Sequence, residues 1–484
     1  MNIEYLPEPE LEFGGGGRSV DIRVGLLQHG PFDRGDARAP GDIKVGLVGT
    51  PETIDGVHRW LTRCQEGLPA RPGRQSSLFQ HFPGCKPVFG IELVLDATLR
   101  ATVEARSIHQ VVARAKRPEA VDDAVQLFHE AASYLVESAR PHVIVCAPPQ
   151  QLLEALERED PPIPVEEEAP EEDDEPSPPM RRRAFHDVLK ARGMSLNAPI
   201  QMVRPETYSE LKRPKSSRRD GGRGVQDPAT RAWNFHTALY YKANGTPWRI
   251  ARNEEYETCY VGVSFYKTLD EKRVMTSMAQ VFNARGDGVV VRGGPARVEK
   301  DDRMPHLAGA DAKELLSRAL TAYHHEHRHQ PARVVVHKTS PFNDEELDGF
   351  RAAAEDQRIT SIELVSINRS FLRLFRNAYY PPLRGTLLTL DDDEALLYLK
   401  GSVPFFRAWP GMYVPRPTGF RLYDAEQPVR VIAQELLALS KQNWNNTQFD
   451  GGWPITVRAA QRVGAILKHI GANDPMQARY SFFM

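Results

Sequence analysis

The sequence has few cysteines and no long apolar run. Its four cysteines, Cys64, Cys85, Cys146 and Cys259, are scattered and form no Cys-x-x-Cys pair. This argues against a cysteine zinc site and favours a reducing compartment. No run of 18 apolar residues is present, and residues 1–7 lack a basic region followed by an apolar core. We therefore expect no membrane span and no secretory signal, and we predict a cytoplasmic protein with no membrane partner.

The net charge is small, but the charge is segregated along the chain. The 484 residues carry a formal charge of −2, with 41% hydrophobic and 26% charged residues, as in an ordinary soluble protein. Residues 159–175 contain ten acidic residues and no basic one, whereas residues 181–223 contain twelve Lys or Arg against four acidic residues. We expect a flexible acidic, Pro-rich insertion at 159–180 and a basic, Gly-rich loop at 213–224. The basic stretches are either a nucleic-acid surface or simply solvated faces.

The first half of the chain predicts an α/β domain, which we place at residues 1–250. Residues 1–22 read as irregular. Apolar runs predict strands at 43–49, 89–95, 143–147 and 200–203, and helical patterns predict helices at 51–63, 119–139, 149–158, 181–192 and 228–243. Strands that alternate with helices indicate a parallel sheet of the doubly wound, Rossmann-like type.

The second half, residues 251–484, predicts a different order. Three β segments at 259–267, 274–282 and 288–292 precede a helix at 311–325, a strand at 333–337, a helix at 343–356 and a strand at 361–367. This is the order of an RNase H-like domain. Further β segments are expected at 385–389 and 395–400, with Asp391, Asp392 and Asp393 in a turn between them. Helices are expected at 425–439 and 455–469.

An RNase H-like nuclease needs carboxylates at the ends of its first and fourth strands to hold divalent metals. Those positions are occupied here by Ser264 and Thr339. Neither side chain supplies a negative charge. We therefore expect this domain to lack nuclease activity and to contain no catalytic residue. The alternative is an active nuclease that draws metal ligands from Asp391–Asp393 or Glu363.

Four polar residues of the first half form the most specific pattern. His186 and Lys190 stand at i and i+4, on one helical face, Gln201 follows on the next strand, and Lys242 ends a later helix. Two ammonium groups can neutralise a terminal phosphate, an amide can donate to it, and an imidazole can donate or stack under a base. A His and a Lys four apart are common on ordinary helices, so the pair alone would carry little weight.

These residues resemble the Argonaute family, whose MID domain clamps the 5′-phosphate of a guide strand with such a set. The segments 260–266, 334–340 and 443–460 are similar to landmarks of its PIWI domain, with the last catalytic position near Ala459 or Ala460. The resemblance runs from about residue 43 to Met484 and includes no PAZ domain. The chain is therefore similar to a short prokaryotic Argonaute, a MID domain followed by a PIWI domain.

The resemblance also implies a cofactor and partners. The carboxylate of the last residue, here Met484, would help to hold Mg²⁺ or a similar divalent cation at the guide phosphate, and the apolar end Ser481–Met484 suits burial. A packed end without a metal role is the alternative. The implied partners are a guide strand, which we expect to be RNA, a complementary single-stranded target DNA, and a separate APAZ-domain effector.

The function implied is that of a guide-binding subunit in a prokaryotic defence system against plasmids or phages. It would form a heterodimer with the effector and oligomerise upon target binding. We rank a TIR or sirtuin-like NAD-consuming effector ahead of a nuclease. A guide-independent nucleic-acid-binding scaffold is a further alternative.

Overall fold

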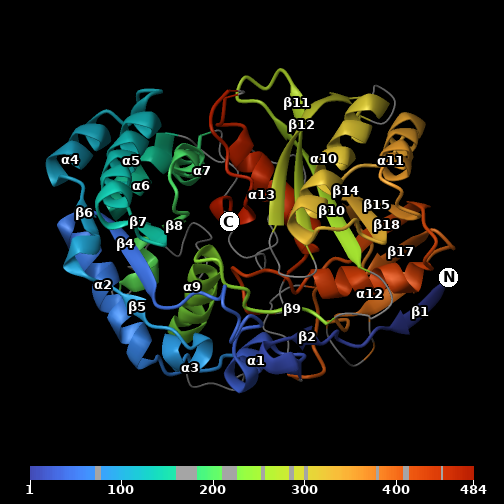
Figure 1. Cartoon of the computed structure of the whole chain (residues 1–484), viewed down its shortest axis with the longest axis horizontal. Coiled ribbons are helices and arrows are strands. Elements are labelled where there is room, and N and C mark those ends of the chain that lie inside the picture. The colour runs from blue at the N-terminus through green and yellow to red at the C-terminus, as the bar shows by residue number, and fades with distance from the viewer. Residues whose placement is uncertain are drawn as a thin grey trace.

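The computed structural model of the chain describes residues 1–70, 78–159, 183–209, 226–251, 257–282, 288–298, 303–375, 377, 381–406, 414–448, 451–471 and 473–484 (Figure 1). The predicted acidic insertion from residue 160 on and the predicted basic loop at 213–224 lie outside these residues. The elements of the first half are β1 (Asn2–Tyr5), β2 (Leu11–Glu12), β3 (Arg18–Ser19), α1 (Ile22–His29), β4 (Ile43–Gly49), α2 (Pro51–Glu66), α3 (Cys85–Phe89), β5 (Leu93–Val94), β6 (Arg100–Thr102), α4 (Ala105–Ala113), α5 (Ala120–Ala139), β7 (Val143–Ala147), α6 (Gln150–Glu159), α7 (Phe185–Arg192), β8 (Ile200–Met202), α8 (Pro205–Tyr208), α9 (Pro228–Lys242) and β9 (Arg249–Ile250).

The elements of the second half close the chain. They are β10 (Thr258–Lys267), β11 (Val274–Phe282), β12 (Gly288–Val298), β13 (Pro305–His306), α10 (Gly309–His327), β14 (Arg333–Lys338), α11 (Asp344–Asp356), β15 (Ser361–Arg369), β16 (Thr386–Thr389), β17 (Glu394–Leu397), β18 (Thr418–Asp424), α12 (Val429–Leu439), α13 (Ile455–Leu467) and a short 3₁₀ helix at Tyr480–Phe482.

The first half forms the predicted parallel sheet. Its strands run in the order β5-β4-β7-β8, and β6 also pairs with β4. Successive residues of β4 and β7 enter two different cores, because side chains alternate across a strand: Leu47 packs on one face and Val48 on the other. A sheet buried on both faces by helices is the arrangement that continuous apolar strands predict.

One predicted strand of this half is shorter than expected. The apolar run at 89–95 forms a strand only at Leu93–Val94, because Phe89 ends α3 instead. Gly90 follows in the left-handed conformation, with φ of 74°, which is a common helix end that glycine adopts at little cost.

The second half is built on a ten-stranded sheet, which runs in the order β1-β16-β17-β18-β15-β14-β10-β11-β12-β13 among the described residues. Strands β10, β11 and β12 are antiparallel neighbours, and β10, β14 and β15 are parallel. The predicted RNase H-like order of three antiparallel strands, helix, strand, helix and strand is therefore confirmed. Strand β18, which pairs with β15, is absent from the sequence-based prediction.

Helices cover both faces of this sheet. Cys259, Val261 and Val263 of β10 share a core with α10 and α11, whereas Tyr260 packs in the core that includes α12 and α13. Helix α13 crosses β10 very closely. A Cβ atom at Gly262 would lie only 2.0 Å from the carbonyl oxygen of Thr456, so this position of β10 requires glycine.

The N-terminal segment belongs structurally to the second half. The expectation that residues 1–22 are irregular was wrong, because Asn2–Tyr5 forms an antiparallel pair with β16. Figure 1 shows this dark blue strand beside α12, across the molecule from β4. Strands β2 and β3 pair with each other, and β2 pairs with β9 just before the second half begins. Their short backbone pairings left no periodic pattern in the sequence, and the division of the chain at residue 250 remains a prediction.

The four cysteines are free and buried. No helix in the described ranges is both long enough and apolar enough to cross a membrane.

Candidate anion-binding site

Helix α7 brings two of the predicted site residues to the interface between the two halves. Phe185, Val188 and Leu189 bury one side of this helix in the core that includes α5. The opposite side, which carries His186 and Lys190, faces α13 and the end of the chain. The i, i+4 spacing therefore places both side chains on one face, as predicted.

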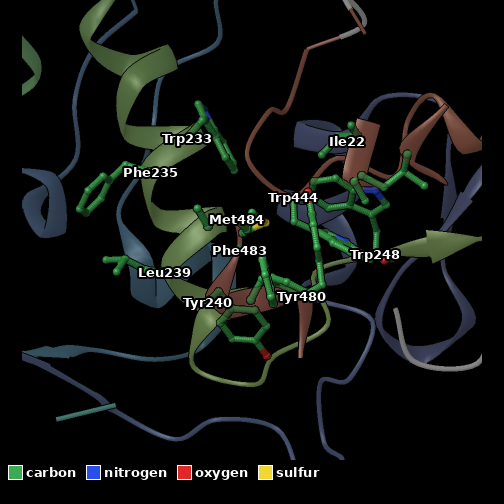
Figure 2. Packing of buried hydrophobic residues seen from close by; sticks show 14 of the residues in the cluster. Ile22, Trp233, Phe235, Leu239, Tyr240, Trp248, Trp444, Tyr480, Phe483 and Met484 are labelled. Atoms are coloured by element: carbon green, nitrogen blue, oxygen red, sulfur yellow. Dashed lines mark hydrogen bonds between the residues drawn. The ribbon is translucent and has the colours of Figure 1, made fainter. Parts of the chain in front are cut away.

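Lys190 is buried between β8 and the last residue of the chain. Its ammonium group donates to the carbonyl oxygen of Ile200 at 3.0 Å and to the main-chain oxygen of Met484. Burial lowers the pKa of Lys190 well below its usual value, and the nearby charges of Lys242 and Arg462 lower it further. The predicted burial of the chain end is confirmed, because Phe483 is fully buried and Met484 nearly so. Figure 2 shows both side chains against α9 and near Trp444.

Lys242 completes the site from the opposite side. It is the last residue of α9, a helix that begins at the Asp227 cap and is buried along most of its length. The Lys242 side chain is only 1% exposed, and its ammonium nitrogen has no hydrogen-bond partner in the described part of the chain. Burial, and after it the charge of Arg462, lowers the pKa of Lys242 to about 7. A buried ammonium without a partner is costly, and this group is one that an anion would satisfy.

Arg462 is a member of the site that sequence reasoning missed. It lies on α13, in the second half, and its guanidinium contacts the Asp187 carboxylate at 3.2 Å. Nδ1 of His186 lies 2.9 Å from the Asp187 carboxylate and 2.6 Å from the Arg462 guanidinium, and Nε2 of the same ring lies 3.2 Å from that guanidinium. This network fits a neutral imidazole. Burial, and next the charge of Arg462, lowers the pKa of His186 to about 3.

Asp187 is the acidic counterpart of this network. Burial alone would raise the pKa of its carboxyl group, but the charge of Arg462 and the hydrogen bond from His186 outweigh burial and hold that pKa below its usual range. No sequence signal marked the pair, because 275 residues separate Asp187 from Arg462 (462 − 187). An Asp beside His186 was visible, but its partner could only be identified in the folded chain.

Gln201 lies beside the site, but its side chain is not joined to it. The residue follows Ile200, whose carbonyl oxygen accepts from Lys190. The amide nitrogen of Gln201 donates instead to the carbonyl oxygen of Met202, at a long distance of 3.4 Å. The structure thus gathers His186, Lys190 and Lys242, with Gln201 at the margin, and adds Arg462.

The residues present do not make a cation site by themselves. The predicted ligand, Met484, offers an oxygen that already accepts from the ammonium group of Lys190. Lys190, Lys242 and Arg462 gather positive charge around it. Within the described ranges, no group of three or more His, Cys, Asp or Glu side chains could hold a metal ion. These donor groups therefore suit an anion. A divalent cation fits the site only when an anion is bound there as well.

The two positions at which we expected an active nuclease to carry carboxylates, Ser264 and Thr339, lie at one edge of the large sheet. Ser264 is buried on β10 opposite Ser277 of β11, and Thr339 directly follows β14, donating its backbone N–H to Val263 at 3.3 Å. The last predicted position, near Ala459 or Ala460, lies on α13, where both residues are buried and the Ala460 carbonyl oxygen accepts from the Ser277 hydroxyl at 2.8 Å. These groups are close-packed and contribute no carboxylate.

The alternative metal ligands are engaged elsewhere. Glu363 is fully buried and forms an ion pair with Arg333, which also binds Glu435. Strand pairing sets Glu363 opposite Val335, four residues from Thr339, or roughly 13 Å along the strand. Asp391 accepts from the backbone N–H groups of Asp393 and Glu394, which confirms the predicted turn.

The sequence matches no protein-family model and no curated protein. Solved structures do match. Clostridium butyricum Argonaute bound to a guide DNA and a 19-mer target DNA superposes with a TM-score of 0.65 at 14% identity, covering 99% of this chain and 54% of that one.

Two further structures give the same result. Drosophila Piwi matches with a TM-score of 0.62 at 14% identity, over 100% of this chain and 56% of that one. Aa-Ago with externally bound siRNA matches with a TM-score of 0.60 at 12% identity, over 99% and 56%. The chain spans about half the length of each. It therefore has an Argonaute-like fold, a Rossmann-like α/β half followed by an RNase H-like half, as predicted.

Proposed function

We propose that this protein binds nucleic acid in a guide-dependent manner and that the site around Lys242 takes the 5′-phosphate of the guide strand. One observation carries the proposal: the buried Lys242 ammonium has no hydrogen-bond partner in the described ranges and lies beside a second buried lysine and an arginine. A terminal phosphate supplies a negative charge to all three groups and an acceptor oxygen to the Lys242 ammonium, which has none among the described residues. The neighbours with this fold include one described as bound to a guide DNA and a target DNA.

Each residue has a distinct part in this proposal. Lys242 pairs directly with the phosphate. Lys190 donates to it while staying anchored to the Ile200 carbonyl and the end of the chain. Arg462, fixed by Asp187, supplies a third positive charge and orients His186, whose ring is the candidate surface for the first base. Gln201 reaches the phosphate only after a rotamer change.

The divalent cation expected from the family resemblance has a limited part here. When bound, such an ion bridges two anions that would otherwise repel each other. In this chain the ammonium group of Lys190 already contacts the Met484 oxygen. We infer that Lys190 and Lys242 neutralise the guide phosphate and that Mg²⁺ binds only together with that phosphate.

The protein would then act by binding alone. Base pairing between the guide, which we expect to be RNA, and a single-stranded target DNA would supply sequence specificity. Ser264, Thr339 and Ala460 offer no carboxylate for phosphodiester cleavage. The biological output would come from a separate APAZ-domain effector in the cytoplasm of a prokaryote, with a TIR or sirtuin-like NAD-consuming domain ranked ahead of a nuclease, in defence against plasmids or phages.

The test compares strands that differ only at the 5′ end. We expect the full chain to bind a 5′-phosphorylated single strand more tightly than its 5′-hydroxyl counterpart, by about 10- to 100-fold, since hydrogen bonds to charged groups contribute about 1.5–3 kcal/mol each. Lys190→Ala combined with Lys242→Ala should abolish this preference. Fluorescence anisotropy at fixed salt measures both ratios.

The matched control is Lys86→Ala, because Lys86 is an exposed lysine that pairs with Glu92 at the surface. This variant should keep the wild-type preference. Equal affinity of wild-type protein for both strands would reject the phosphate site and favour a guide-independent scaffold. Circular dichroism of the double variant confirms that a lost preference does not reflect unfolding.

A further inference from the structure

The segment that follows β15 emerges at the same edge of the sheet as Ser264 and Thr339. Strands β10, β14 and β15 are parallel, so their carboxyl ends meet at one edge. Lys338 pairs with Ser366, which sets Thr339 level with Ile367. Residues 370–375 begin only three residues further along, about 10 Å of extended chain. A nucleic-acid strand that passes Ser264 and Thr339 at this edge of the sheet therefore comes near residues 370–375.

This segment exposes large apolar side chains. Phe371 is 71% exposed and Phe375 is 87% exposed, and Leu372 between them is also exposed. Single exposed apolar residues are normal, but three large apolar side chains exposed within five residues indicate a binding surface.

Arginines accompany these rings. The Arg416 guanidinium lies 5.6 Å from the centroid of the Phe371 ring, and that of Arg369 lies 5.3 Å from the Trp453 ring. Arg373 is exposed between the two phenylalanines. Residues 368–377 contain three arginines and no acidic residue, so this stretch carries a net positive charge.

The backbone of the segment is held in place. Ser370 donates its N–H to the carbonyl oxygen of Pro417 at 3.2 Å, and Leu374 donates its N–H to the Tyr398 hydroxyl at 2.6 Å. The Arg373 side chain donates to the carbonyl oxygen of Val414 at 3.5 Å. Exposed rings on an anchored backbone lose less entropy when they bind than rings on an unanchored loop.

We propose that Phe371 and Phe375, with Arg369, Arg373 and Arg416, form an aromatic–arginine surface on which bases of a single-stranded nucleic-acid segment stack. Rings that alternate with cationic groups suit this ligand, because bases present flat faces and the backbone presents phosphates. An apolar protein partner would match the rings alone, whereas a single strand matches both the rings and the positive charge of this stretch. The inference rests on the proposed function, since it names a second contact of the same nucleic acid beyond the phosphate site.

The test replaces both rings at once. The probe is a 5′-phosphorylated single-stranded oligonucleotide of about 20 nucleotides, bound to the full chain. Phe371→Ala combined with Phe375→Ala should weaken binding by about fivefold or more for each base that stacks. The ratio between 5′-phosphate and 5′-hydroxyl strands should stay at the wild-type value, because the phosphate site is untouched. Strands that carry 5-iodouridine should cross-link to Phe371 or Phe375 on irradiation.

Two control variants sharpen the result. Tyr134→Ala removes an equally exposed aromatic ring from α5 in the other half and should leave affinity unchanged. Arg373→Gln should reduce the slope of log affinity against log salt by about 0.7, the value for one phosphate contact on a single strand.

The outcomes separate this surface from the phosphate site. Unchanged affinity in the double phenylalanine variant, with no cross-link to the segment, would overturn the aromatic–arginine surface while the 5′-phosphate preference stands. Loss of a co-purifying protein by that variant, with nucleic-acid affinity unchanged, would assign the surface to a protein and also overturn it. Equal binding of phosphate and hydroxyl strands would reject the proposed function, whereas a cross-link to Phe371 would still support this surface.

Discussion

Lys242 and Lys338 are both buried lysines at the end of a regular element, and their surroundings differ. The Lys338 ammonium, at the end of β14, donates to Glu346 at 2.7 Å and to the Pro341 carbonyl at 2.5 Å. The Lys242 ammonium, at the end of α9, has no such partner within the described residues. A paired buried charge maintains the fold, whereas an unpaired one lowers the stability of the free protein and leaves an interaction for a ligand to supply.

The same contrast separates the two candidate sites. At the sheet edge, Ser264 and Thr339 are small hydroxyl residues, and Ser277 and Ala460 are hydrogen-bonded to each other. At the interface between the halves, the charges of Lys242 and Arg462 both lower the pKa of the buried Lys190, and Lys242 has no hydrogen-bond partner among the described residues. The first region is satisfied by its own chain and the second is not. We therefore expect ligand binding to stabilise the second region far more than the first.

The largest expected effect comes from replacing Lys338, the lysine that is paired. Lys338→Met takes the lysine cation from the fully buried Glu346 carboxylate, which keeps its contacts with His306 and the backbone N–H of Leu307, and should lower the free energy of unfolding by up to about 3–5 kcal/mol. Urea unfolding measures the loss. The second variant Lys338→Met with Glu346→Gln should recover part of it, and no recovery would show that Lys338 acts through packing rather than charge.

The matched change at the other lysine should have the opposite sign. Below pH 7, Lys242→Met removes a buried charge that has no partner among the described residues and keeps the length of the side chain, so the ligand-free protein should gain about 1–3 kcal/mol of stability. Adding a 5′-phosphorylated strand should stabilise wild type and not this variant. A loss of stability in the ligand-free variant would mean that Lys242 has a partner within the chain.

The pH dependence follows from the pKa of Lys242. Its folded value of about 7 lies below the unfolded value of 10.5, so the unfolded state binds more protons between these two pH values. The stability of the ligand-free protein should therefore rise with pH from about 7 to about 10 through this group, and its cost is fully present below pH 7. Lys190, whose pKa is also lowered, contributes with the same sign.

Binding of a 5′-phosphate should raise the lowered pKa of Lys242 back toward its usual value. At pH 8 most Lys242 side chains are neutral in the free protein, so binding of a 5′-phosphorylated strand should take up about one proton or less from Lys242. Isothermal titration calorimetry in two buffers with different ionisation enthalpies measures the uptake. The Lys242→Met variant should lose it, and an identical uptake in that variant would assign the proton to another group.

The smallest expected effect concerns cleavage. Wild-type protein with Mn²⁺ should cut neither guide nor target, because the sheet edge lacks carboxylates. Ser264→Asp combined with Thr339→Asp should acquire a Mn²⁺-dependent rise in melting temperature of a few degrees, since a bound ion stabilises the state that holds it. It should still not cleave, as Ala460 supplies no third ligand. Mn²⁺-dependent cleavage by wild type would support an active nuclease with other ligands.

The sequence by itself determined most of the fold. The apolar runs at 43–49 and 143–147 and the order of elements from 258 to 369 predicted both sheets, because period-2 and continuous apolar patterns depend only on which faces are buried. It also determined three of the gathered cationic and imidazole side chains, His186, Lys190 and Lys242, and the missing carboxylates at Ser264 and Thr339. These are local facts that residue identity and spacing record.

Only the tertiary structure decided the rest. Asn2–Tyr5 joins β16 in a pairing across almost the whole chain, and four residues are too few for a periodic signal. Arg462 reaches Asp187 from the other half, and Phe371 and Phe375 could equally have been core residues. Whether a side chain is buried, paired or exposed depends on segments distant in sequence, and those long-range contacts turned a set of basic residues into a site with an unsatisfied charge.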